Sequence, residues 1–315
     1  MKILVTGGCG YVGSVLIPQL LNEGHKVISI DTQWFGNYLP NHKNLINLKI
    51  DLRDTDLIPL EGIDIVIHLA NIANDPAVEL NPTLSWEINV LSSLQLIDKA
   101  IRNNVKKFIF ASSGSVYGIK DEPKVTEDLS LVPISVYNKT KMVAERVFLS
   151  YLDKIKIYNI RPATVCGFSP RMRLDVSVNM LTFQALRNKK ITVFGGSQIR
   201  PNIHIKDMVN TYKFFIDNEP ESGNYNAGFE NISILDIAKL VQKVVPSEIV
   251  VTKSNDPRSY RQDSTKLLNI GFKPKFGVAN AIEEIKQTFN LGKLEDKENY
   301  YTVKWMRKLK LEMQK

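Results

Sequence analysis

The sequence has 315 residues, of which 43% are hydrophobic and 23% are charged. These proportions exclude an intrinsically disordered chain, and the length allows one large or two modest domains whose cores need no disulfides. Lys and Arg number 41 against 33 for Asp and Glu, which gives a formal net charge of +8. This positive surplus either provides solubility and a basic tail or indicates an anionic partner, which could be nucleic acid, a membrane surface or a small substrate.

Cysteine and histidine usage argues against metal and disulfide chemistry. Cys9 and Cys166 are the two cysteines, and the four histidines are scattered along the sequence. This excludes a disulfide framework, and no metal site can be read from the spacing. The chain opens with the strand-like KILVTG rather than a secretory signal, and no apolar run approaches the roughly 18 residues of a membrane span. We therefore expect a cytoplasmic protein.

Short β-branched segments alternate with segments of helical spacing through the first half of the chain. Several of the short segments are continuously apolar, as in strands that are buried on both faces. The expected strands cover residues 3–6, 27–30, 46–50, 65–69, 108–111 and 155–160, and the expected helices cover 11–22, 83–102 and 136–152. This alternation predicts an α/β fold with a doubly wound parallel sheet of the Rossmann type.

The pattern changes after Pro162, where loops lengthen and Pro, Gly and Arg punctuate them. Further helices are expected near residues 176–187, 234–245 and 278–290. We interpret this half as a smaller lobe interleaved with the sheet. The expected division is a dinucleotide-binding domain over residues 1–165, which regains a strand and a helix near 190–225, and a mainly substrate-binding lobe over 166–315.

The last twenty residues are basic and amphipathic. Tyr301, Trp305, Leu309 and Met313 fall every four residues along one helical face. A helix of this kind could lie on a membrane surface, but we favour a helix docked on the protein itself or on a second subunit.

A glycine-rich loop directly follows the first expected strand. Gly7, Gly10 and Gly13 have the spacing G-x-x-G-x-x-G, and Tyr11 and Val12 lie between the last two. Such a loop between a strand and a helix lets the backbone approach a pyrophosphate, and the helix N-terminus favours negative charge there. We expect these five residues to bind a dinucleotide.

Acidic residues end the second and third expected strands. Asp31 can accept hydrogen bonds from an adenosine ribose and would repel a 2′-phosphate, and no arginine directly follows it. This favours NAD over NADP. Asp51 is a weaker candidate for the adenine edge, because it could equally cap the helix that follows.

Tyr137 and Lys141 form a Tyr-x-x-x-Lys pattern. Residues four apart share a helix face, so the ammonium lies beside the phenol. A free tyrosine titrates at about 10, and we expect the ammonium and an oxidised nicotinamide to lower the pKa of Tyr137 toward the working range. Ser112 and Ser113 follow the fifth strand at the carboxyl edge of the sheet, where a hydroxyl can hold a substrate alcohol or carbonyl.

At family level, the sequence resembles the extended short-chain dehydrogenase/reductases that act on nucleotide sugars, the NAD-dependent epimerase/dehydratase group. The likeness spans nearly the whole chain and rests on TGGCGYVG, Asp31, HLAN, ASSGSVYG, YNKTK, Arg161-Pro162, IRPNIHIKD and DPRSYRQD. It implies that Ser113, Tyr137 and Lys141 form a catalytic triad and that Asn89 orders active-site water and backbone. It further implies that NAD contacts Leu52, Leu69, Ala70, Asn89, Tyr137, Lys141 and Pro162, besides the glycine loop, Asp31 and Asp51.

The resemblance also narrows the reaction. Dehydratases that remove water across C5–C6 carry an Asp-Glu pair where this chain has Gly114-Ser115, and the GDP-fucose synthase type carries a cysteine at Ser115. The reaction that the resemblance then implies is oxidation of a nucleoside-diphosphate sugar at C4 to a transient 4-keto intermediate. Return of the hydride to the other face of this intermediate would make the enzyme an epimerase. The alternative is a C4 dehydrogenase or 4-ketoreductase of the GDP-heptose or deoxysugar type, and a non-catalytic relative that binds NAD or nucleic acid is a third hypothesis.

Substrate-binding residues are expected mainly in the second lobe. By family likeness, Arg200, Arg258 and Asn179 are assigned to the diphosphate, while Arg171 and Arg173 could equally be solvated surface. Ser115 and Thr164 complete the set, although UDP-galactose 4-epimerases carry an asparagine at Thr164. The resemblance implies a homodimer formed through helix 83–102 and the Tyr137 helix, and no nucleic-acid or membrane partner is expected.

Overall fold

The computed structural model describes residues 1–253 and 259–311. Its main feature is a parallel sheet of seven strands in the order β10-β6-β5-β4-β1-β2-β3. Since β1 pairs with both β2 and β4, the winding reverses there, and this reversal opens a crevice at the carboxyl ends of the strands. The strands are β1 (Lys2–Thr6), β2 (Lys26–Asp31), β3 (Leu45–Lys49), β4 (Ile65–His68), β5 (Lys107–Ala111), β6 (Lys156–Pro162) and β10 (Gly223–Ala227).

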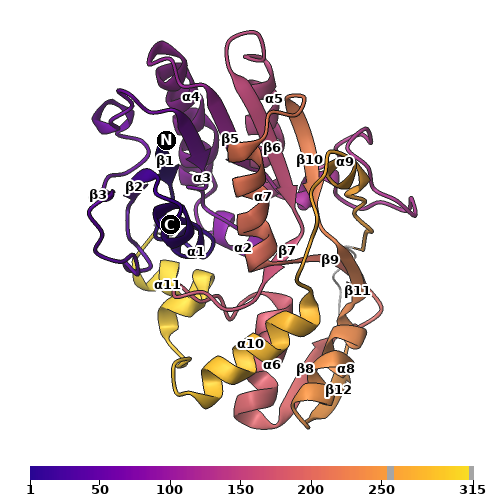
Figure 1. The fold of residues 1–315 in the computed structure, drawn as a ribbon. Helices are drawn as coiled ribbons and strands as arrows, with labels where there is room; N and C mark the ends of the chain where they lie inside the picture. The colour runs from indigo at the N-terminus through magenta and orange to yellow at the C-terminus, as the bar shows by residue number, and fades with distance from the viewer. Residues whose placement is uncertain (254–258, 312–315) are drawn as a thin grey trace.

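Helices cover both faces of this sheet (Figure 1). Alternate side chains of a strand point to opposite faces, so Ile3 and Val5 join the core beneath one helix layer and Leu4 joins the core beneath the other. The first layer holds α1 (Gly13–Asn22) and α7 (Ile205–Asp217), and the second holds α3 (Pro82–Trp86), α4 (Ser92–Arg102) and α5 (Val136–Leu149). The predicted doubly wound parallel fold is confirmed.

The helix expected over residues 83–102 is interrupted. A π turn (η2, Glu87–Leu91) separates α3 from α4. Such turns often occur at functional sites, and this one carries the buried Asn89. Short elements complete this half of the chain: η1 (Thr55–Leu57), α2 (Asp75–Val78) and η3 (Gly114–Tyr117).

The second lobe has its own small sheets and core. β7 (Thr164–Cys166), β9 (Ile199–His204) and β11 (Glu230–Ser233) form one sheet, and β8 (Lys190–Phe194) pairs with β12 (Glu248–Thr252) in another. α6 (Ser177–Asn188), α8 (Ile234–Val244) and α10 (Val278–Asn290) enclose a separate apolar cluster, and α9 (Thr265–Asn269) is a short helix beside β10. Between these elements the chain returns to the large sheet through α7 and β10, whereas β8 stays in the second lobe.

The C-terminal segment docks on the protein itself. It contains η4 (Glu298–Tyr300) and α11 (Thr302–Lys308), which lies beneath the first half of the chain in Figure 1. The indole Nε1 of Trp305 donates to the carbonyl of Trp34 at 2.6 Å, and Met306 is buried. Met313 lies outside the described residues.

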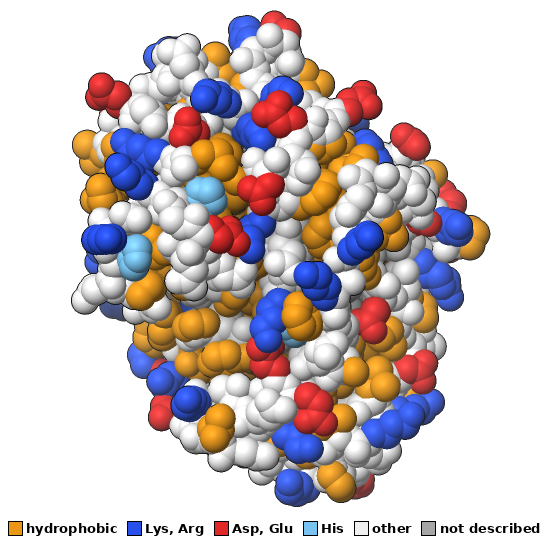
Figure 2. Space-filling view, viewed as in Figure 1, with side chains coloured by type: hydrophobic (Ala, Val, Ile, Leu, Met, Phe, Trp, Pro, Cys, Tyr) orange, Lys and Arg blue, Asp and Glu red, His pale blue; other side chains and the backbone are white. Residues whose placement is uncertain are grey.

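Figure 2 shows acidic and basic side chains interspersed over the face in view, with no continuous basic patch there. Within residues 1–253 and 259–311, no helix combines the length and the apolar composition that a membrane span requires.

Candidate active site

A cavity of about 730 Å³ opens at the carboxyl ends of β1, β2, β4, β5 and β6, and the second lobe forms its far wall. Most of the residues predicted from the sequence line it. These are Gly7, Gly10, Tyr11, Val12, Gly13, Asp31, Asp51, Leu52, Leu69, Ala70, Ser113, Ser115, Tyr137, Lys141, Pro162, Thr164, Arg171, Arg173 and Arg200. Asn89 and Asn179 lie outside its wall, and Arg258 lies outside the described residues.

The glycine loop is packed too tightly for side chains. A Cβ on Gly7, whose φ is +71°, would lie 2.6 Å from the backbone nitrogen of Ala70. A Cβ on Gly13 would lie 2.5 Å from the carbonyl oxygen of Gly8. Both clashes are with backbone, which cannot swing away as a side chain can. The loop therefore keeps the N-terminus of α1 open toward the cavity, which is the arrangement that a pyrophosphate needs.

Asp31 is held at the end of β2 by two backbone donors. The amide of Cys9 donates to one carboxylate oxygen at 3.0 Å and the amide of Gln33 donates to the other at 2.6 Å. Burial raises the pKa of Asp31, while these donors and the charge of Arg171 lower it. The position suits a ribose hydroxyl.

Asp51 is bound by Arg53 rather than by a helix end. The backbone amide of Arg53 donates to its carboxylate at 2.9 Å, and the guanidinium pairs with it, also at 2.9 Å. The N-cap of the following η1 is Asp54, so Asp51 does not act as that cap. Its side chain remains in the cavity wall.

The three expected catalytic residues meet at one end of the cavity. Ser135 caps α5 by accepting from the amide of Asn138 at 3.1 Å, which places Tyr137 in the first turn and Lys141 one turn later. Lys141 Nζ lies 5.8 Å from the centre of the Tyr137 ring and donates to the carbonyl of Ala111 at 2.5 Å. The hydroxyl of Ser113 hydrogen-bonds Tyr137.

The protonation of this triad differs from the expectation. Burial raises the pKa of Tyr137 to about 12, although the bond from Ser113 lowers it. Burial also lowers the pKa of Lys141 to about 7, against the opposing charge of Glu145. A low-dielectric site disfavours both charged forms, so the ammonium alone does not bring Tyr137 into the working range. The positive ring of an oxidised nicotinamide would favour the phenolate further.

A second hydroxyl lies beside Ser113 in the cavity wall. Ser115 lies 2.7 Å from the Ser113 hydroxyl and donates to the side-chain oxygen of Asn138 at 2.6 Å. The chain Ser113–Ser115–Asn138 thus holds both serines in the cavity wall.

A buried ion pair behind the triad went unpredicted. Glu145 follows Lys141 by four residues on the same face of α5, which is the signal that could have identified it. Arg161 of β6 binds its two carboxylate oxygens at 2.9 and 2.7 Å, and both side chains are at most 2% exposed. Glu145 also accepts a short hydrogen bond from Ser112, the neighbour of Ser113. The pair therefore joins α5, β5 and β6 beneath the site.

Two asparagines that were expected to contact ligands hydrogen-bond protein groups instead of lining the cavity. Asn89 accepts from the amide of Ile72 at 2.9 Å and donates to Thr140 at 3.1 Å, so it orders the backbone that follows β4. Asn179 accepts from the amide of Gly167 at 2.9 Å and donates to the Tyr11 hydroxyl at 3.0 Å. Because Asn179 is fully buried by these contacts, it supports the cavity wall from behind instead of facing a diphosphate.

The two arginines of the loop after β7 point to different parts of the cavity wall. Arg171 stacks on Phe35 at 4.1 Å and its charge acts on Asp31. Arg173 pairs with Asp175 at 2.9 Å, and its charge acts on Tyr137. One guanidinium thus faces the expected ribose end and the other the catalytic end.

Other cavity residues were not predicted. Asn71 lines the cavity, and its buried side-chain nitrogen and oxygen have no hydrogen-bond partner within the described residues. Its position directly after HLA at the switch point could have suggested it. Such unsatisfied polar atoms fit a cofactor with polar groups. Asp75 also lines this end, accepts from Ser135 and acts electrostatically on Tyr137.

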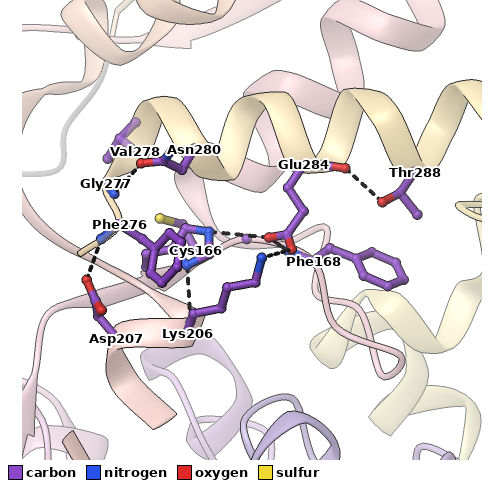
Figure 3. Close-up of polar contacts among 12 residues, drawn as sticks. Cys166, Phe168, Lys206, Asp207, Phe276, Gly277, Val278, Asn280, Glu284 and Thr288 are labelled. Carbon is purple, nitrogen blue, oxygen red and sulfur yellow. Dashed lines mark hydrogen bonds and ion pairs between the residues drawn. The ribbon is translucent and has the colours of Figure 1, made fainter. Parts of the chain in front are cut away.

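Glu284 of α10 anchors the loop that carries these arginines. Its carboxylate pairs with Lys206 at 2.8 Å and lies 3.3 Å from the ring nitrogen of His204. It also accepts from the backbone amide of Phe168 at 3.3 Å. Figure 3 shows Glu284 reaching from its helix to this loop. His204 and Lys206 hold the pKa of Glu284 at about 2, against the effect of burial.

Similarity to known proteins agrees with this geometry. A UDP-glucose 4-epimerase of Lactobacillus helveticus is 29% identical over 311 residues, covering 87% of this chain and 92% of the relative. A protein of Bacillus subtilis named uncharacterized UDP-glucose epimerase YtcB is 35% identical over 262 residues, covering 78% and 82%. The structure of a Thermotoga maritima UDP-glucose 4-epimerase with UDP-glucose matches with a TM-score of 0.83 at 25% identity, over 92% of this chain and all of that one.

The family model described as "NAD dependent epimerase/dehydratase family" matches residues 3–228. Since that match covers more than half of the chain and includes the glycine loop, Asp31 and the triad, the protein is an enzyme that belongs to the NAD-dependent epimerase/dehydratase family, with NAD as its cofactor.

Proposed function

We propose that the enzyme epimerises a nucleoside-diphosphate sugar at C4. The observation that carries the proposal is the meeting of Ser113, Tyr137 and Lys141 at one end of a cavity whose far wall is the second lobe. That wall offers the guanidinium of Arg200 for a phosphate and the ring of Phe194, which is 55% exposed, as a flat apolar surface for a base. Thr164 and Ser115 line the same cavity.

The proposed mechanism follows from the triad geometry. Tyr137 as phenolate accepts the proton of the C4 hydroxyl, and Ser113 hydrogen-bonds the oxygen as it becomes a carbonyl. Lys141, fixed by its bond to Ala111, holds positive charge near the phenolate. The glycine loop and Asp31 would hold NAD, which would supply a hydride acceptor for C4 and a hydride donor for the return. Rotation of the 4-keto sugar before that return gives inversion, and Tyr137 then donates the proton back.

The alternative within the same site is a C4 dehydrogenase or 4-ketoreductase. Incubation with UDP-glucose, UDP-galactose and their GDP counterparts separates the two reactions. Interconversion of the sugars without net NADH supports the epimerase, and stoichiometric NADH with a keto-sugar supports the dehydrogenase. Tyr137→Phe is expected to abolish turnover in either case while NAD still binds. Full activity of Tyr137→Phe would contradict the assignment of the base.

A homodimer is part of the proposal. Trp86 and Leu91 are 37% and 52% exposed on the helical segment that runs from α3 to α4. Apolar side chains on this surface favour association through α4 and α5, as the resemblance implies. Sedimentation equilibrium tests it, with a Leu91→Glu variant expected to shift the protein toward monomer.

A further inference from the structure

Arg171 is a buried cation that forms no direct ion pair with a carboxylate among the described residues. It is 4% exposed, its Nε has no hydrogen-bond partner, and one terminal nitrogen donates to the carbonyl of Met172 at 3.3 Å. Over residues 1–253 and 259–311 no carboxylate forms an ion pair with it: Asp175 pairs with Arg173, and the charges of Asp175 and Asp31 act on Arg171 without a direct contact. Its guanidinium stacks 4.1 Å above the ring of Phe35. A buried, unpaired guanidinium is costly, so this position calls for an anion.

The backbone leading to Arg171 is bound directly to the glycine loop. The Tyr11 hydroxyl donates to the carbonyl of Gly167 at 2.6 Å, and the Ser169 hydroxyl donates to the carbonyl of Tyr11 at 2.7 Å. Ser169 also lies 2.9 Å from the hydroxyl of Ser14, in the first turn of α1. Arg171 therefore enters the cavity two residues beyond a contact with the N-terminus of α1. The space between them lies where backbone N–H groups favour a phosphate.

The C-terminal segment holds Arg171 and Phe35 together. Asn299 donates to the carbonyl of Phe35 at 2.9 Å. The carbonyl of Tyr300 accepts from the amide of Leu174 at 3.0 Å, and the amide of Thr302 donates to Asp175 at 3.0 Å. The loop after β2 and the loop after β7 are thus tied by one segment, which fixes the guanidinium in place before any ligand arrives.

We propose that Arg171 binds the pyrophosphate of NAD from the side opposite the glycine loop, and is a cofactor residue rather than a residue for the substrate diphosphate. A planar guanidinium can bind two phosphate oxygens at once, and the pyrophosphate supplies the direct ion pair that the described carboxylates do not. Second-lobe placement of this cation makes the lobe part of the cofactor site. The inference rests on NAD as cofactor and not on the proposed sugar substrate.

The test compares ligands with and without the pyrophosphate in Arg171→Met, by calorimetric titration and thermal unfolding. The dissociation constants of NAD and ADP-ribose are expected to rise roughly 10- to 100-fold, the range of a lost charge-assisted hydrogen bond. Those of adenosine and UDP are expected to stay unchanged. The melting temperature without ligand is expected to stay equal or rise, since a buried unpaired cation is removed, while the increase caused by NAD shrinks.

Controls separate this inference from the proposed function. Arg187→Met removes an exposed cation that pairs with Asp296 and should change neither NAD nor UDP binding. Arg200→Met should weaken the binding of UDP and leave the binding of NAD unchanged. If UDP binding is not weakened, the result counts only against the proposed substrate. If Arg171→Met does not fold, Arg171→Lys retains the charge without the fork and should still weaken NAD. An unchanged affinity of Arg171→Met for NAD would overturn the proposal, and so would a weaker affinity for UDP with an unchanged affinity for NAD.

Discussion

Removal of the charge on Glu145 should both destabilise the protein and change its pH dependence. In Glu145→Gln the guanidinium of Arg161 loses the carboxylate that binds it at 2.9 and 2.7 Å, in a site where both side chains are at most 2% exposed. Breaking a buried pair by removing one partner costs about 3–5 kcal/mol, because the other charge stays buried and uncompensated. Urea unfolding should show this loss with an unchanged dependence on urea concentration.

The same variant should narrow the active pH range from the alkaline side. Glu145 opposes the burial that lowers the pKa of Lys141 to about 7. Besides Glu145, the groups that face Lys141 are Tyr137, the Phe110 ring and the neutral, buried His68. Without the carboxylate the pKa of Lys141 falls further, so the ammonium is lost at lower pH. The alkaline limb of the rate profile should therefore move to lower pH.

Two further variants test the role of the Glu145–Arg161 pair. Glu219→Gln removes an exposed carboxylate that pairs with Lys156 and Lys107 and should leave both unfolding and the pH profile near those of the unmodified protein. Glu145→Gln combined with Arg161→Met should be more stable than Glu145→Gln alone, since no unpaired charge remains. A loss below about 1 kcal/mol in Glu145→Gln together with an unmoved alkaline limb would refute the role assigned to the pair.

Two further predictions follow from the loops around the cavity. Gly13→Ala places a methyl 2.5 Å from the carbonyl of Gly8, so overpacking should lower the free energy of unfolding by roughly 1–3 kcal/mol and displace the loop from NAD. Thermal unfolding with and without NAD measures both effects. An NAD-induced stabilisation equal to that of the unmodified protein would contradict this prediction. The pKa of Glu284 is held at about 2 by Lys206 and His204, so its contribution to stability is complete above its ordinary pKa of 4.5 and is lost as the pH falls toward 2. Urea titrations at several pH values should show that Glu284→Gln lacks this part of the acid dependence. If the free energy of unfolding of the variant and of the unmodified protein fell in parallel with pH, Glu284 would contribute nothing.

Much of the first half could be predicted from the sequence, because its signals are local. Strands buried on both faces are nearly continuously apolar, so the segments that end at Thr6 and Asp31 were recognisable. The glycine spacing encodes backbone conformations and close approaches that other residues cannot adopt. Tyr137 and Lys141 share a face by helical geometry alone.

The direction of the second-lobe side chains could not be predicted in this way. Arg171 and Arg173 are two residues apart in the sequence, yet Arg171 stacks on Phe35 and the charge of Arg173 acts on Tyr137. That divergence depends on contacts of their loop with Tyr11 and with the C-terminal segment. Loops carry few local constraints, so their course is decided by partners far along the chain.

The sequence by itself therefore determined the sheet and the glycine loop, and it pointed to Ser113, Tyr137 and Lys141 as the expected catalytic residues. Only the tertiary structure decided which polar residues face the cavity and how they are charged. Asn179 is fully buried behind the wall, and the pKa values of Tyr137 and Lys141 shift to about 12 and about 7. The physical reason is that periodicity and spacing act over a few residues, whereas burial, counter-charges and loop anchoring come from residues that only the folded chain brings together.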